Sequence, residues 1–368
     1  MRSASTALFT ACLVGITPIN PTLAQSITPA PDGTGTIINY NGNTYHITGG
    51  TQAGANLFHS FQQFGLQPSE IADFLSNPEI SNVVGRVIGG DPSVIEGLIR
   101  LSGGNSNLFL VNPAGWVFTE GASVDVPGSF GVTTANRIGF GAGFFNAAGD
   151  NDYAALTGDP TSLMFDSSQP GAIINTADLN VSNGSLWMVG GSVISTGSIT
   201  APNGTVTLAA VPGESKVKLS HDGMTLSFFL DALAVDEVQA GTPLGIRAVD
   251  LPGFLNGSSE VGNANEVVKT ENGELWLIGS QLRVEEGDVV VGNRVIAENV
   301  DLVAAGRVQV SDPSEIAGTT TVVRLPEADG PVSLNIIDRH ADNADALLYG
   351  SAAGTIVALS RTMKMGLP

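Results

Sequence analysis

The sequence predicts an all-β protein built as a right-handed parallel β-helix, a solenoid whose stacked coils share one apolar interior. Glycine is abundant at 46 residues, and only 14% of the residues are charged, which favours short strands and tight turns over disorder. The apolar runs are three to five residues long, with Asn, Gly, Ser and Thr between them. An Asn-Gly turn at Asn183 returns at Asn203, and a repeat of about 20 residues is typical of a solenoid.

Residues 1–24 have the pattern of a secretory signal peptide. Arg2 precedes a short apolar run, and the small residues Thr22 and Ala24 form a cleavage site. The run is shorter than the roughly 20 residues needed to span a bilayer. A buried helix and a lipid anchor on Cys12 are the alternatives, and too little apolar sequence precedes Cys12 for the anchor. No later segment is long and apolar enough to span a membrane, so we expect an exported, soluble protein that meets a membrane only during export.

Cys12 is the only cysteine, so the mature chain is expected to contain none. Two interpretations stay open. A chain of this length can bury enough apolar surface without disulfides, and a chain threaded unfolded through a pore must avoid crosslinks. The formal charge of −20 has the wrong sign for neutralising phosphates, which excludes nucleic acid as a partner.

From residue 25 to 165 the pattern mixes strands and short helices. Two strands flank Asn41-Gly42, a strong hairpin signal. The apolar residues of 56–65 are predicted to share one face of a short helix, and 68–75 and 91–95 predict two more helices. These elements predict a short hairpin and short helices outside the coils.

Residues 166–325 are predicted to form the β-helix shaft. The segment 183–190, which contains Trp187, recurs at 272–279 with Trp276, and both tryptophans are expected to pack inside a coil or a groove. Sugar stacking is the alternative role. Residues 326–368 are predicted to form a short α/β-like tail, with a strand at 331–338, a helix at 341–349 and a strand at 355–359. This tail resembles the start of an α/β domain of unknown function that follows β-helical regions in very large secreted bacterial proteins.

A series of specific motifs follows in order along the chain: Asn56-Leu57-Phe58-His59-Ser60-Phe61, Asn77-Pro78-Glu79-Ile80, Arg86-Val87-Ile88-Gly89-Gly90-Asp91-Pro92-Ser93, Asn107-Leu108-Phe109-Leu110-Val111-Asn112-Pro113-Ala114-Gly115, Val124-Asp125-Val126-Pro127-Gly128-Ser129-Phe130 and Thr133-Thr134-Ala135. In these motifs the chain resembles the haemagglutination-activity domain of filamentous-haemagglutinin-like exoproteins, over about residues 33–165. That resemblance implies a capped right-handed β-helix bound by the periplasmic domains of a dedicated outer-membrane transporter.

Two Asn-Pro motifs characterise the family, and both have counterparts here. The first motif is retained at Asn77 and Pro78, and Glu79 departs from it. The second motif is retained at Asn112, Pro113 and Gly115. Ala114 and Trp116 depart from the second motif. In each, Asn caps a turn through its amide and Pro fixes the next φ, and Gly permits a positive φ in the second. The resemblance implies a role in transporter recognition for these five residues. The alternative is that both motifs are only tight turns of the β-helix.

The sequence predicts no catalytic, cofactor or metal site. The four histidines are far apart, and His59 is expected to be a hydrogen-bonded packing residue. A polysaccharide lyase or glycosidase is the alternative function, since such enzymes also use β-helices. It would need acidic residues clustered with Lys or Arg in a groove. Acidic groups occur at 150–152, 236–237 and 285–288, but basic residues are too scattered to complement them.

We therefore expect a non-enzymatic exoprotein of a two-partner secretion system, secreted or held at the cell surface after passage through the periplasm. The shaft is expected to be adhesive or surface-associated, with a host-cell or matrix surface as its possible partner.

Overall fold

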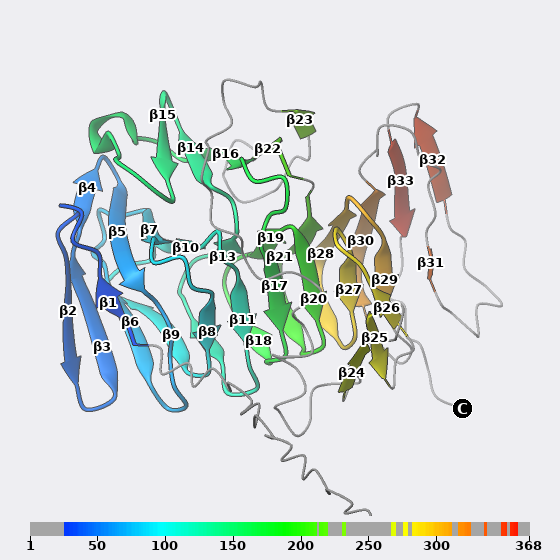
Figure 1. The fold of residues 1–368 in the computed structure, drawn as a ribbon, viewed down its shortest axis with the longest axis horizontal. Helices are drawn as coiled ribbons and strands as arrows, with labels where there is room; N and C mark the ends of the chain where they lie inside the picture. Colours follow the sequence, from blue (N-terminus) through cyan, green and yellow to red (C-terminus); the bar gives the residue numbers. More distant parts are fainter. Residues whose placement is uncertain are drawn as a thin grey trace, which may run out of the picture.

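A computed structural model describes residues 26–211, 213–219, 230–232, 266–269, 275–278, 282–310, 316–324, 335–336, 347–351 and 354–359. Within these residues the chain is a stack of parallel coils that runs from β2 at one end to the tail strands at the other (Figure 1). The coils contribute strands to three sheets, which we call A, B and C, and the strands of successive coils pair in parallel. The coils up to residue 125 add strands to all three sheets, and the later coils add strands to A and C. The predicted parallel β-helix is confirmed. The predicted signal peptide, residues 1–24, lies outside the described residues.

Sheet A is the longest of the three. Its strands, in spatial order, are β1 (Thr28–Pro29), β5 (Asn56–Gln63), β7 (Asn82–Val87), β10 (Asn107–Val111), β13 (Phe130–Thr133), β19 (Leu186–Gly190), β21 (Ile199–Ala210), β28 (Val295–Ala304), β30 (Ile316–Arg324), β33 (Gly354–Leu359) and β32 (Leu347–Ser351), with β4 (Thr51–Ala53) beside β5 and β18 (Leu179–Asn180) beside β21.

Sheets B and C form the other two sides of the coils. Sheet B contains β2 (Thr36–Asn41), β3 (Thr44–Gly49), β6 (Ile71–Leu75), β9 (Leu98–Ser102) and β12 (Ser123–Asp125). Sheet C contains β8 (Ser93–Ile95), β11 (Trp116–Phe118), β17 (Ala172–Asn175), β20 (Ser192–Ser195), β27 (Val289–Val291), β29 (Val308–Val310) and β31 (Asn335–Ile336).

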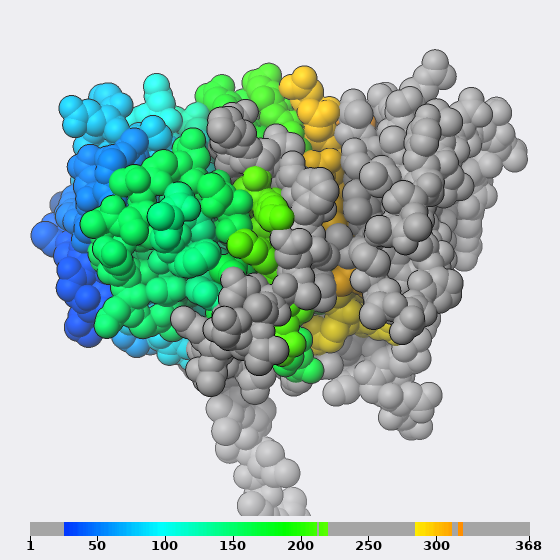
Figure 2. All heavy atoms as spheres, turned by 90° about the horizontal axis from the view of Figure 1, so that it is seen from above, coloured from blue at the N-terminus to red at the C-terminus, as the bar shows by residue number. Residues whose placement is uncertain are grey.

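Two antiparallel sheets lie outside the coils. Sheet D contains β15 (Gly143–Asn146), β14 (Arg137–Phe140), β16 (Pro160–Phe165), β22 (Ser215–Lys218) and β23 (Leu230–Ala232); sheet E contains β24 (Glu266–Lys269), β25 (Leu275–Ile278) and β26 (Leu282–Val284). A 3₁₀ turn, η1 (Tyr153–Ala155), lies between β15 and β16. Seen from above, the atoms around β14–β16 lie next to the first coils (Figure 2).

The apolar residues divide between two cores. The coil interior holds the inward residues of sheets A, B and C, among them Phe61, Trp116 and Leu186. A second core lies between the outer face of sheet A and sheet D, where Phe58 and Trp187 pack against strands β14–β16. Burying both faces of sheet A explains why its strands read as nearly continuous apolar runs.

The 20-residue repeat is confirmed for its first pair, because Leu186 and Val206 are in register on β19 and β21. The prediction is wrong for the more distant copy of the repeat, since Trp276 lies on β25 in the antiparallel sheet E. The parallel stack continues instead from Val206 to Val300 on β28. The sequence similarity between 183–190 and 272–279 therefore indicates a strand in each segment, but not that both strands belong to the same sheet.

The three predicted N-terminal helices are wrong. Residues 56–63 form β5, 71–75 form β6 and 93–95 form β8. Phe58 faces sheet D while Phe61 faces the coil interior, so both faces of β5 are apolar and the pattern imitated a helix. In the tail the strand at 355–359 is confirmed as part of β33, whereas Leu347–Tyr349, predicted as helix, belong to β32. Residues 341–346 lie outside the described part.

Candidate functional site

The first Asn-Pro motif forms a turn at the corner between sheets B and A. The Asn77 side-chain oxygen accepts a hydrogen bond from the Glu79 N–H at 2.8 Å, and the Ile80 N–H donates to the Asn77 carbonyl at 3.1 Å. Asn77, Pro78 and Glu79 are exposed, while Ile80 is buried. Both bonds join residues no more than three apart, so this turn can close before neighbouring coils are in place.

The second motif forms the same turn at the corner between sheets A and C. The Asn112 side-chain oxygen accepts from the Ala114 N–H at 3.0 Å, and the Gly115 N–H donates to the Asn112 carbonyl at 3.0 Å. Asn112, Pro113 and Gly115 are all buried. Gly115 has a φ of +114°, a region that residues with a side chain rarely adopt. This observation confirms the predicted positive φ.

Neighbouring coils hold the second turn in place. The Asn112 amide nitrogen donates to the Ser93 hydroxyl and to the Asp91 carbonyl, both at 3.0 Å. The Thr133 carbonyl of the following coil accepts from the Asn112 N–H at 3.0 Å and from the Trp116 indole at 3.1 Å. The second turn is thus complete only when three coils have stacked. The two turns lie at different corners of different coils, so the fold does not bring them together.

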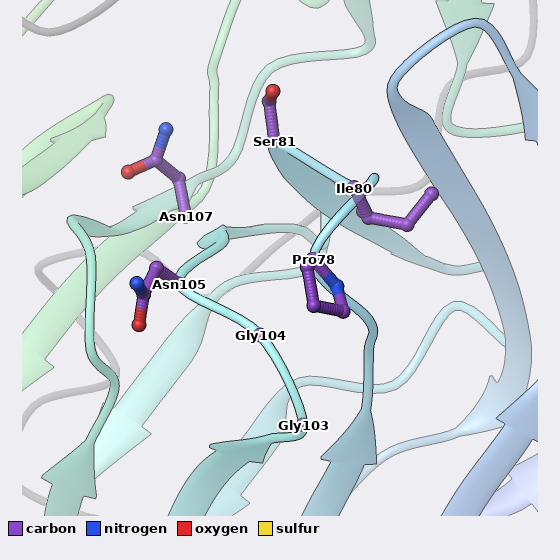
Figure 3. Close-up of a pocket in the computed structure, with 7 residues that line it drawn as sticks. All are labelled: Pro78, Ile80, Ser81, Gly103, Gly104, Asn105 and Asn107. Atoms are coloured by element: carbon purple, nitrogen blue, oxygen red, sulfur yellow. The ribbon is translucent and has the colours of Figure 1, made fainter.

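A hollow with a volume of about 530 Å³ adjoins the first turn (Figure 3). Pro78 and Ile80 lie on one side of it, and Asn105 and Asn107 lie on the other. A Cβ atom at Gly104 would stand 2.6 Å from the Asn77 carbonyl oxygen, so only glycine allows the two coils to approach this closely. The first turn therefore has an exposed apolar edge beside a polar recess.

A ladder of polar side chains at the start of the sheet A strands was not predicted. The Asn82 amide donates to the Asn56 side-chain oxygen, and the Asn107 amide donates to Asn82, each at 2.9 Å. The Ser129 N–H donates to the Asn107 oxygen at 2.9 Å, and the Ser185 N–H donates to the Ser129 hydroxyl at 2.8 Å. The recurrence of Asn at 56, 82 and 107 was the sequence signal that could have revealed it.

His59 is fully buried in the coil interior, between Phe61 and Phe74, with ring centroids 6.2 and 5.9 Å away. Neither ring nitrogen has a hydrogen-bond partner among the described residues, which corrects the predicted hydrogen-bonded role. Burial lowers the pKa of His59 from 6.5 to about 4. The neutral His59 ring is therefore a packing residue, and its protonation would destabilise the folded stack.

The acidic group at 285–288 is held by its own neighbours. Asp288 is buried, accepts from the Arg307 guanidinium at 2.7 Å and from the Gln309 amide at 2.9 Å, and also caps the Glu285 N–H at 2.9 Å. Burial raises the pKa of Asp288, although the bonds from Arg307 oppose the shift. Within the described residues no three His, Cys, Asp or Glu side chains are placed to hold a metal ion. Residues 236–237, also considered for a lyase, lie outside the described part.

Comparisons with known proteins give one family match and one structural similarity. A protein-family model described as the TPS secretion domain matches residues 25–240. The chain is similar to a crystal structure of the HMW1 secretion domain from Haemophilus influenzae, with 16% sequence identity, 80% of this chain and 74% of that chain covered, and a TM-score of 0.43. No curated protein sequence matches. No helix of the described residues is long and apolar enough to cross a membrane.

Proposed function

Since the chain belongs to the family of TPS secretion domains, the exported domains of two-partner systems, we propose that residues 25–165 carry the signal that its outer-membrane transporter recognises. Members of this family are secreted through the periplasm and across the outer membrane by a partner transporter, and they are typically non-enzymatic. The match extends to residue 240, and sheet D joins strands on both sides of residue 165. The finer boundary at 165 remains a prediction.

The observation that carries the proposal is the exposed first turn inside the matched span. Asn77 and Pro78 form a turn from local hydrogen bonds alone, so its shape is available to a partner while the rest of the chain is still extended. Asn112, Pro113 and Gly115 act differently in this proposal. Because their turn is completed by neighbouring coils, they contribute through folding outside the cell, where coil formation prevents the chain from sliding back.

A binding measurement tests the proposal. The mature full-length chain is applied to immobilised periplasmic domains of the matched transporter, and wild type is compared with Asn77→Ala. Asn41→Ala serves as the control, because Asn41 is an exposed residue of the β2–β3 hairpin turn. We expect wild type and Asn41→Ala to bind alike and Asn77→Ala to bind more weakly. If wild type does not bind, or binds only as weakly as an unrelated acidic protein, the proposal fails.

A surface-associated or adhesive role for the folded protein rests on the open outer face of sheet B. Ile37 on β2 and Leu75 on β6 are 54% and 38% exposed, and β3 lies between their strands. Exposed apolar patches mark contact surfaces. We propose no enzymatic role in addition to adhesion. In the acidic group at 285–288, the Asp288 carboxylate already accepts hydrogen bonds from the Glu285 N–H and from Arg307. Retention of wild type on host-cell or matrix surfaces, lost in Ile37→Ser with Leu75→Ser, would test the adhesive role.

A further inference from the structure

The first coils contain a buried cation, Arg86, and two of its four hydrogen-bond partners come from the segment outside the coils. Arg86 on β7 is 2% exposed. Its guanidinium donates to the Asn146 and Gly149 carbonyls at 2.7 and 2.8 Å, both in the β15 region of sheet D. It also donates to Asp32 of the N-terminal segment at 2.8 Å and to the Ser60 hydroxyl of the preceding coil at 2.9 Å. A single side chain thus joins the cap, two coils and the outer sheet.

The start of the polar ladder depends on the same outer segment. The Asn56 amide donates to the Leu156 carbonyl at 2.9 Å and to the Gly158 carbonyl at 2.7 Å. Asn82 adds a longer bond of 3.3 Å to the Asp159 side chain. Both asparagines are buried. Without the outer segment the Asn56 amide would lose both of its acceptors, whereas the Asn82 amide would keep its bond to Asn56.

Two further contacts tie the cap to this segment. The Thr34 hydroxyl and the Tyr153 hydroxyl are 2.6 Å apart. Phe58 of β5 packs against Phe145 and Tyr153, with ring centroids 4.9 and 5.6 Å away. Burial opposes ionisation of Asp32, but hydrogen bonds from Ser60, Thr34 and Arg86 lower its pKa to about 2, so Arg86 faces a charged carboxylate at neutral pH.

We infer that the cap and first coils, residues 26–133, are not an independent folding unit and become stable only when residues 146–159 dock on them. Asp32 and Ser60 pair two nitrogens of Arg86 within residues 26–133, but both partners of its third nitrogen, Nη1, come from the outer segment. Burying a guanidinium with one nitrogen unpaired is destabilising, so Arg86 stays hydrated and the coils are not stable around it until Asn146 and Gly149 dock. For a chain that leaves a pore N-terminus first, more than a hundred residues must therefore emerge before the first coil locks. The inference concerns folding alone and does not depend on recognition by the transporter.

Arg100 provides a matched control for Arg86. It also pairs with an aspartate, donating twice to Asp73 at 3.0 Å, but Asp73 lies on the adjacent strand β6. Its side chain is 32% exposed, compared with 3% for Arg86. Loss of this pair removes a contact between neighbouring coils and leaves the outer segment untouched.

The test is amide hydrogen exchange on the mature full-length chain. During refolding, amides of β7 and of β14–β15 should gain protection in one kinetic phase. At equilibrium, Arg86→Met should raise exchange in both regions by the same factor, about 100-fold or more, whereas Arg100→Met should change both by less than about tenfold. If Arg86→Met does not fold, Tyr153→Phe, which removes only the bond to Thr34, should raise exchange in both regions by about fivefold. Protection of β7 before β14–β15, or faster exchange in one region only, would overturn the inference.

Discussion

The two Asn-Pro turns have the same local chemistry and opposite surroundings. In each turn, the side-chain oxygen of the asparagine accepts a hydrogen bond from the N–H of the residue two positions later. The backbone carbonyl of the asparagine accepts one from the N–H of the residue three positions later. Asn77 is exposed, whereas Asn112 is buried and bonded to Ser93 and Asp91 of the preceding coil. The motif therefore determines the backbone conformation of the turn. The position of the turn in the stack determines whether it is exposed to a partner protein or packed against a neighbouring coil.

The largest difference between the turns should appear at Gly115. Its φ of +114° is strained for any residue with a Cβ, and the position is buried. Gly115→Val should lower the free energy of unfolding by about 4 kcal/mol, from backbone strain and overpacking together. Chemical denaturation of the mature chain measures this loss. A loss below about 1 kcal/mol would show that the second turn relaxes without cost and that the contrast between the turns is wrong.

The next effect concerns the two asparagines compared directly. Asn112→Ala removes the acceptor of the buried Ala114 N–H and the donor to Ser93, and should cost about 3 kcal/mol. Asn77→Ala removes one bond at an exposed turn and should cost less than about 1 kcal/mol. The two variants are compared in the same denaturation series. Equal losses would mean that burial does not separate the two turns.

The burial of His59 should make the stability of the fold depend on pH. The folded pKa of His59 is lowered to about 4, so between about pH 6.5 and 4 the unfolded chain binds a proton that the folded chain does not. Stability should therefore fall as pH is lowered through this window, by about 2 kcal/mol between pH 7 and 5. His59→Leu should reduce this dependence. A wild-type pH profile unchanged by His59→Leu would contradict this assignment.

The smallest expected effect is at Glu79. Its side chain is exposed, and only its backbone N–H takes part in the first turn. Glu79→Ala should change the free energy of unfolding by less than about 0.5 kcal/mol. Thermal and chemical unfolding should match wild type. A loss as large as that of Asn112→Ala would show that the exposed turn has a structural role that its geometry does not indicate.

The sequence predicted the solenoid and both turns because these depend on local signals. Asn, Pro and Gly specify a turn within four residues, and Asn183 and Asn203 mark successive coils. It failed where burial depends on partners distant in the chain. The apolar run at 57–64 has the pattern of a helix because sheet D covers the outer face of this strand. No local sequence pattern indicates that sheet D packs there. Trp276 matched Trp187 in sequence but belongs to a different sheet, because strand pairing is decided by the whole stack.

The most direct test of the account is the secreted yield through the matched transporter, measured side by side for wild type, Gly115→Val, Asn112→Ala and Glu79→Ala. We expect Gly115→Val and Asn112→Ala to lower the yield several-fold, because a weaker second turn slows the folding that retains the emerging chain. Glu79→Ala should be secreted like wild type. Equal secretion of all four proteins would contradict the account, and the export determinant would then lie outside these turns.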